Sequence, residues 1–169
     1  MRFCVLLIML LLSSVSVYAQ CKTDSMLAST PDSKLIDNKD NTITDLQTGL
    51  MWKKCSEGFS GESCGTGSIA SFTWQQALEQ PDIVNNNGGF AGYYDWRLPN
   101  IKELLSIVEE QCWWPAINRN RFPDTPNSYF WSASPHELSY AWSIDFGRGD
   151  LSFDTRDTSY YVRLVRGGN

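Results

Sequence analysis

The chain has 169 residues, of which 42% are hydrophobic and 13% aromatic, and its formal net charge at pH 7 is −5. This length fits a single domain. A net negative charge offers no general attraction for phosphate, so the composition argues against a general nucleic-acid-binding protein. Beyond the N-terminal segment no apolar run is long enough to span a bilayer, so we expect no transmembrane segment.

Residues 1–19 have the pattern of a secretory signal peptide. A short basic start, Met1-Arg2, precedes an apolar run over 5–12, and small residues ending at Ala19 provide a cleavage site. We therefore predict cleavage after Ala19 and export to the periplasm or the outside of the cell. The alternative is a lipid anchor on Cys21. It is disfavoured because Gln20 stands where a lipoprotein signal requires a small residue.

The cysteines that remain after cleavage predict two disulfides with three possible pairings. They are Cys21, Cys55, Cys64 and Cys112. The short loop between Cys55 and Cys64 closes easily, which favours Cys55–Cys64 and leaves Cys21–Cys112. A zinc site is the alternative, but the chain has no Cys-x-x-Cys pair and its only histidine is His136. We therefore expect no metal and no cofactor.

The first half of the mature chain predicts an arm, a hairpin and a helix. Residues 20–34 are polar and lack a clear period, so we expect an arm before a single domain over 35–169. Short runs at 42–44 and 50–54 flank the turn Thr48-Gly49 and predict a hairpin. Thr73 and Gln76 form a capping box that predicts a helix beginning at Trp74, and Pro81 is expected to limit its length.

A strand-to-helix corner over 93–108 is expected to organise the core. Asn100 is a good N-cap with Glu103 at the reach-back position, and Ile101, Leu104, Leu105 and Val108 form one apolar stripe. Before the helix, Asp95 and Arg97 alternate with two apolar residues. We expect this pair of charged residues to make structural ion pairs or backbone hydrogen bonds rather than to bind a ligand.

The last third predicts strands at 129–134, 140–146, 151–154 and 160–166, with a hairpin turn at 147–150. Apolar and polar residues alternate in each run, which indicates a half-buried antiparallel sheet. The predicted fold class is α+β, with two helices packed on a mostly antiparallel, twisted sheet that the disulfides brace.

Several short motifs, in this order, resemble the Lcl-type C-terminal domain, a bacterial extracellular module named after a collagen-like adhesin. They lie at 45–52, 95–104, 115–118, 122–126, 130–134 and 161–166, and the resemblance extends from about residue 36 to residue 167. The resemblance implies a fold similar to C-type lectins and formylglycine-generating enzymes, and it implies export. For the adhesin that names the family it implies binding of sulfated glycosaminoglycans at the cell surface.

The residues favour binding over catalysis. The formylglycine-generating relatives use reactive, metal-binding cysteines, whereas the mature cysteines here are better explained as disulfides. His136 has no nucleophile at motif spacing, and Ser132 and Ser134 lie in no Gly-x-Ser-x-Gly turn. We expect a secreted, adhesin-like, non-catalytic domain that recognises carbohydrate or sulfated glycan. The alternative is a structural or protein-interaction module of an envelope assembly, and the oligomeric state stays open.

The candidate ligand-binding residues are aromatic and basic. Two adjacent rings, Trp113 and Trp114, cannot easily both point inward, so one of them is a candidate platform for a sugar; the alternative is that both pack over Cys112. The candidate basic residues are Arg119, Arg121, Arg148 and Arg156. The alternative for these arginines is that they are scattered in solvent or ion-paired. An exposed tryptophan beside arginines would favour the carbohydrate site.

Overall fold

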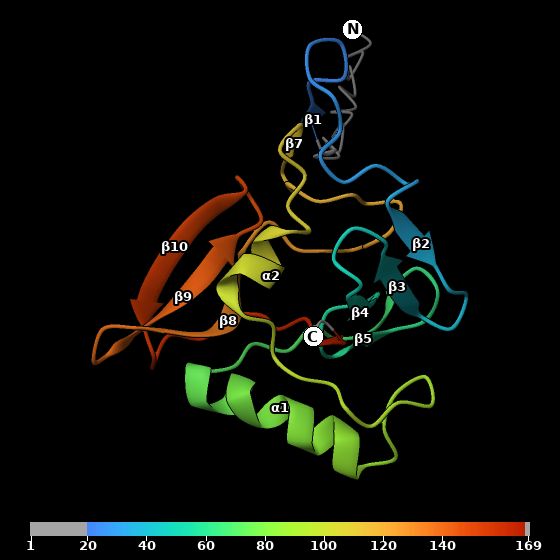
Figure 1. Ribbon diagram of the computed structural model, residues 1–169. Coiled ribbons are helices and arrows are strands. Elements are labelled where there is room, and N and C mark those ends of the chain that lie inside the picture. Colours follow the sequence, from blue (N-terminus) through green and yellow to red (C-terminus); the bar gives the residue numbers. More distant parts are fainter. Residues whose placement is uncertain (1–19, 168–169) are drawn as a thin grey trace, which may run out of the picture.

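The computed structural model describes residues 20–167 (Figure 1). The predicted signal peptide, residues 1–19, lies outside the described residues. The elements, in chain order, are β1 (Gln20–Cys21), β2 (Leu35–Asp37), β3 (Thr42–Asp45), β4 (Met51–Lys53), β5 (Phe59–Ser60), β6 (Thr66–Gly67), α1 (Trp74–Asn86), α2 (Ile101–Leu105), β7 (Cys112–Trp113), β8 (Tyr129–His136), β9 (Tyr140–Asp145), β10 (Asp150–Thr155) and β11 (Val165–Arg166).

The strands form two main sheets and two short ribbons, and every named pair is antiparallel. One sheet has the order β10-β9-β8 and the other the order β11-β4-β3-β2, while β1 pairs with β7 and β5 with β6. Figure 1 shows α2 near the centre, with the three-stranded sheet on one side of it and β2 to β4 on the other. The expected α+β class with two helices and mostly antiparallel strands is confirmed.

Two groups of buried side chains hold these elements together. The first joins the four-stranded sheet, α2 and the three-stranded sheet through residues such as Trp52, Leu104 and Ile144. The second lies where α1 packs against β8 and includes Ala77, Trp96 and Trp131. The strand-to-helix corner contributes to both groups, because it supplies Leu104 to the first and Trp96 to the second. Burying large aromatic and aliphatic side chains is the main favourable contribution to folding.

The helix starts and the first hairpin agree with the sequence. Both capping boxes are present, from Thr73 to Gln76 at α1 and from Asn100 to Glu103 at α2. Strands β3 and β4 pair as the predicted hairpin. The two disulfides are Cys55–Cys64 and Cys21–Cys112, which is the pairing that the short loop favours.

The expected helix ends are wrong in both cases. Pro81 lies inside α1, which continues to Asn86; the proline ring is buried, and this burial offsets the backbone hydrogen bond that proline cannot donate. α2 stops at Leu105, which is 40% exposed, instead of continuing to Val108. The chain turns there because Val108 forms a bridge with Ile117.

The single sheet expected for the last third is also wrong in part. β8, β9 and β10 form one sheet, but residues 160–166 do not continue it as a fourth strand. Only β11 is regular, and it pairs with β4 in the other sheet. Before it, Tyr161 makes an isolated bridge to Phe130 in β8. The segment therefore crosses from one sheet to the other, which alternation of apolar and polar residues cannot reveal.

The charged residues of the corner have structural partners. Arg97 makes a two-pronged ion pair with Glu103, at 2.7 Å for both hydrogen bonds. Asp95 accepts from the guanidinium of Arg166 at 2.7 and 3.2 Å, and that guanidinium lies over the ring of Tyr93 at 3.8 Å. Asp95 and Arg97 make the expected structural ion pairs, Arg97 within the corner and Asp95 with the end of the chain.

Candidate functional site

The segment after β7 is tied to the turn between β9 and β10, and this fixes the position of the exposed tryptophan. The backbone N–H of Trp114 donates to the carbonyl of Gly147 at 2.9 Å, and that of Ala116 donates to Phe146 at 2.6 Å. Trp114 has a φ of 60°, and its peptide bond to Pro115 is cis.

The two adjacent tryptophans have different surroundings. Trp113 is half-buried beside the arm, where the Nζ atom of Lys22 lies 5.7 Å from its ring centroid. Trp114 is 48% exposed. Of the two candidate platforms, the structure therefore presents Trp114 to solvent.

Two hollows adjoin the Trp114 ring and share Asn127 in their walls. The first, of about 160 Å³, lies toward the β9–β10 turn and is also lined by Tyr129, Asp145 and Arg148. The second, of about 220 Å³, lies toward residues 115–126. Its wall includes Arg119 and Asp124. Each hollow therefore combines Trp114 with one arginine and one aspartate.

The β9–β10 turn that carries Arg148 has little freedom to move. The carboxylate of Asp145 accepts from the backbone N–H of Gly147 at 2.8 Å. The backbone carbonyl of Asp145 accepts from the backbone N–H of Gly149 at 2.7 Å. Gly149 has a φ of +81°, and a Cβ atom there would lie 2.9 Å from a methyl group of Val108. The turn therefore needs glycine at this position both for its backbone conformation and for its close approach to the chain after α2.

The arginines fall into two groups. Among residues 20–167, the guanidinium groups of Arg119 and Arg148 make no hydrogen bond or ion pair with the protein, and both line the hollows at Trp114. The other arginines of that range all have protein partners: Arg97, Arg121, Arg156, Arg163 and Arg166. Two of the four predicted binding arginines therefore gather at the exposed tryptophan.

The other two predicted arginines hold the fold. Arg121 donates to the carbonyl of Leu35 at 2.6 Å and pairs with Asp32 at 3.5 Å. Arg156 donates to the carbonyl of Tyr140 at 3.1 Å and lies over the ring of Trp74 at 4.4 Å. Neither guanidinium lines a hollow at Trp114. The sequence could not show which arginines have structural partners, because the partners of Arg121 and Arg156 are distant in the chain.

Arg163 is the most deeply buried charged side chain of the second half. It is fully buried and donates to the carbonyls of Lys53 and Lys54 and to the hydroxyls of Ser56 and Thr125. Burial lowers the pKa of Arg163 to about 9, and the nearby charge of Glu57 opposes this effect. The group remains charged at neutral pH and joins the hairpin to the end of the chain.

A third hollow, of about 390 Å³, lies between the arm and residues 109–120. The arm contributes Thr30 and Asp32, the opposite wall contributes Asn118 and Asn120, and the Cys21–Cys112 disulfide lies at its edge. Arg119 lines this hollow as well as the second one. The sequence analysis found no site here, because the arm has no periodic pattern to reveal what it packs against.

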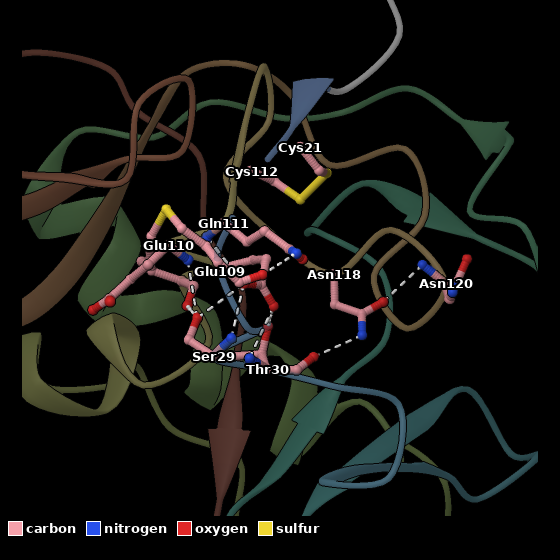
Figure 2. The surroundings of a disulfide bond; sticks show 11 residues. Cys21, Ser29, Thr30, Glu109, Glu110, Gln111, Cys112, Asn118 and Asn120 are labelled. Carbon is pink, nitrogen blue, oxygen red and sulfur yellow. Dashed lines mark hydrogen bonds between the residues drawn. A yellow bond between two sulfur atoms is a disulfide. The ribbon is translucent and has the colours of Figure 1, made fainter. Parts of the chain in front are cut away.

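Glu109 holds the arm in place (Figure 2). Its carboxylate is buried, with 3% of the residue exposed, and accepts from the N–H and the hydroxyl of both Ser29 and Thr30 at 2.8 to 3.1 Å. The N–H of Gln111 donates to it as well, at 3.1 Å. Desolvation raises the pKa of Glu109, but these hydrogen bonds outweigh it and the pKa lies below its ordinary value. The charged carboxylate is therefore a structural anchor.

The single histidine lies in an aromatic cluster on the three-stranded sheet. The ring of His136 packs against those of Trp142 and Phe153, each at 4.4 Å between centroids. No group of three or more histidine, cysteine, aspartate or glutamate side chains within residues 20–167 is placed to hold a metal ion. Neither described helix has the length and hydrophobicity to cross a membrane.

Comparison with known proteins identifies a family for most of the chain. The family model of the Lcl C-terminal domain matches residues 41–166. A search of curated proteins found no significant match. The matched range contains Trp114, Arg119 and Arg148, and the arm lies before it. The chain belongs to the Lcl C-terminal domain family.

Proposed function

We propose that this protein is an exported, non-catalytic binding domain that recognises carbohydrate at the exposed face of Trp114, with Arg119 and Arg148 contacting sulfate or carboxylate groups of the glycan. We also propose that the fold is of the C-type-lectin kind. Membership of an extracellular type of domain family supports export, to the periplasm or the cell surface.

One observation carries the proposal. Within residues 20–167 the two arginines without a protein acceptor are the two that flank the one tryptophan ring that is about half exposed. Aromatic rings offer apolar faces to sugar rings, and arginine presents a planar set of donors that matches the oxygens of sulfate and carboxylate. Such guanidinium groups can bind a ligand without first breaking a structural contact.

The aspartates in the same hollows set the expected selectivity. Asp145 and Asp124 place one negative charge beside each arginine. A dense polyanion gains little from such a balanced surface, whereas sugar hydroxyls can donate to the carboxylates. We therefore expect a preference for a glycan with hydroxyl groups and few anionic groups over a densely charged polymer.

A glycan array with the mature protein, residues 20–169, tests the proposal, with sulfated, carboxylated and neutral glycans side by side. For the glycan that binds, calorimetry should show a loss of affinity of about tenfold or more for Trp114→Ala, because large aromatic anchors dominate binding energies. Arg119→Ala and Arg148→Ala should weaken binding and reduce its dependence on salt.

Two control variants remove comparable exposed groups that line neither hollow. Tyr94→Ala removes an aromatic side chain on a residue that is 64% exposed, and Lys102→Ala removes an exposed positive charge. Both should bind as the wild type does. If no glycan binds, or if Trp114→Ala binds as well as wild type, the proposed carbohydrate site is wrong.

A second candidate function is a protein-interaction module of an envelope assembly. The observation that favours it is the edge strand β10, whose residues Leu151 and Phe153 are 52% and 49% exposed. An exposed strand edge with apolar side chains can pair with a strand of another protein. This function predicts that Phe153→Asp abolishes capture of an envelope partner while glycan binding is unchanged.

A further inference from the structure

We infer that the hollow between the arm and residues 109–120 is a second subsite for the same ligand, so that the domain binds along an oligosaccharide chain rather than a single sugar. The inference rests on the proposed function at Trp114. It adds that the arm, which lies before the region matched by the family model, forms part of the binding surface.

The three hollows are adjacent and share side chains. Trp114 and Asn127 line both hollows at the tryptophan, and Arg119 lines the second of these together with the arm hollow. The series therefore extends from Arg148, past Trp114 and Arg119, to Asn120. A ligand that occupies the whole series must be elongated.

The volumes favour the same conclusion. The hollows at Trp114 measure about 160 and 220 Å³, below the roughly 300–1,000 Å³ of typical small-molecule sites. The arm hollow, at about 390 Å³, lies within that range. The tryptophan by itself therefore offers a platform for part of a ligand, and the arm hollow provides room for a further unit.

The walls of the arm hollow suit sugar hydroxyls. The carboxylate of Asp32 accepts from the side-chain amide of Asn118 at 2.8 Å and from that of Asn120 at 3.3 Å. The Asp32 side chain is 46% exposed, so its oxygens can also accept from a ligand. Arg119 adds a donor without a structural partner in the described chain. Carboxylate, amide and guanidinium groups together match a ligand rich in hydroxyl groups with an occasional anionic group.

The arm is fixed in the position that this subsite needs. Glu109 accepts hydrogen bonds from Ser29 and Thr30, and the side chain of Asn118 donates to the carbonyl of Thr30 at 2.8 Å (Figure 2). The Cys21–Cys112 disulfide joins the two walls at one end. A wall held in this way need not be ordered when the ligand arrives, which favours binding.

A chain-length series tests the inference. The probes are a hyaluronan-derived disaccharide, tetrasaccharide and hexasaccharide, which carry one carboxylate per disaccharide and no sulfate, titrated into residues 20–169 by calorimetry. For the wild type, the hexasaccharide should bind about tenfold or more tightly than the disaccharide. Ala28→Trp, which fills the arm hollow from an exposed position, should remove this difference and leave disaccharide affinity unchanged. Asn120→Ala, which keeps the hollow open but removes a donor, should reduce the difference.

The outcomes separate this inference from the function on which it rests. If Trp114→Ala weakens every probe while Ala28→Trp and Asn120→Ala leave hexasaccharide affinity at the wild-type value, the carbohydrate site stands and the arm subsite is wrong. Equal affinity of the wild type for all three lengths also overturns the subsite. If no probe binds, or if Trp114→Ala changes nothing, the proposed function fails and the subsite fails with it.

Discussion

At the scale of single residues, Trp114 combines an exposed ring with a backbone conformation that other residues adopt more easily. Its φ of 60° lies in the left-handed region, which costs an L-residue with a side chain roughly 1–2 kcal/mol. Strained backbone of this kind occurs more often at functional sites than elsewhere. Trp114 lines both the hollow that contains Arg148 and the hollow that contains Arg119.

Replacing Trp114 by glycine should separate stability from binding. Relief of the left-handed strain offsets the lost packing of a half-exposed ring, so we expect the free energy of unfolding to change by less than about 1 kcal/mol. Trp131→Ala, at a fully buried ring, should cost about 3–5 kcal/mol. Urea denaturation measures both. A large loss of stability in Trp114→Gly would mean that the ring serves the fold.

Glu109→Gln should destabilise the arm. The amide keeps one acceptor oxygen but turns an NH₂ group toward the backbone N–H of either Ser29 or Thr30, leaving buried hydrogen-bonding groups unpaired. We expect a loss of about 2–3 kcal/mol at neutral pH, measured by urea denaturation. Glu110→Gln is the matched control, because the neighbouring carboxylate is exposed; it should change stability little.

The same carboxylate predicts a dependence on pH. The pKa of Glu109 in the folded protein lies below its ordinary value of 4.5, so its contribution is complete above pH 4.5 and is lost as the pH falls through the folded pKa. At Asp37, desolvation is outweighed by hydrogen bonds from Lys39 and Lys54, which lower the pKa to about 2. Stability should therefore fall between about pH 4.5 and 2, and less steeply in Glu109→Gln than in wild type.

At the scale of elements, the turn between β9 and β10 positions the site. Gly149 and Gly92 have nearly the same φ, +81° and +80°, but a Cβ atom would meet Val108 and Ala116 at Gly149 and nothing within 4 Å at Gly92. The two positions therefore share the backbone cost of replacing glycine and differ in packing. This difference isolates the close approach of the turn to the chain after α2.

Gly149→Ala should lower the free energy of unfolding by about 1–3 kcal/mol more than Gly92→Ala, because the turn must move away from Val108. Movement of the turn also displaces Arg148, so glycan affinity should fall in Gly149→Ala alone. Urea denaturation and calorimetry on the two variants measure these effects. Equal losses of stability in both would show that the turn tolerates a side chain.

The elements also show how far the sequence predicts this structure. Signals that act within one turn of helix, such as Thr73 with Gln76 and Asn100 with Glu103, locate both helix starts. The ends of the helices are set by tertiary contacts. These contacts are the burial of Pro81 in α1 and the Val108 bridge after α2, and local sequence patterns do not reveal them.

The same limit applies to the candidate site. Adjacency in the sequence identifies Trp113 and Trp114 as candidates, and the candidate basic residues include Arg119 and Arg148. The sequence cannot show that Arg121 and Arg156 are committed to Leu35, Asp32 and Tyr140, because these partners are far along the chain. It also cannot show that the arm forms one side of a hollow.

At the scale of the whole molecule, the two disulfides constrain very different lengths of chain. Cys21 and Cys112 are 91 residues apart, whereas Cys55 and Cys64 are 9 residues apart. Since a longer closed loop removes more entropy from the unfolded chain, the first bond constrains the unfolded state more. It is also the covalent link between the arm and the region that the family model matches.

Removing the long-range disulfide should therefore cost more stability than removing the local one. Loop-closure entropy gives about 4–5 kcal/mol for the pair Cys21→Ser and Cys112→Ser, and about 2–3 kcal/mol for Cys55→Ser and Cys64→Ser. Urea denaturation of the two double variants shows which pair of substitutions lowers the free energy of unfolding more. The reverse order would show that the contacts of Glu109 hold the arm without the bond. If the arm subsite exists, the first pair should also weaken hexasaccharide binding more than disaccharide binding.

The exposure of Trp114 gives the molecule an optical reporter at the candidate site. Trp52, Trp96 and Trp131 are shielded from water, with at most 2% exposed, whereas Trp114 is 48% exposed. Quenchers in solution therefore reach the fluorescence of Trp114 more readily than that of these three rings, while Trp74, Trp113 and Trp142 are partly exposed and contribute a background. The difference in acrylamide quenching between wild type and Trp114→Gly isolates the Trp114 signal, and loss of that difference on adding a glycan would show that the ring is covered.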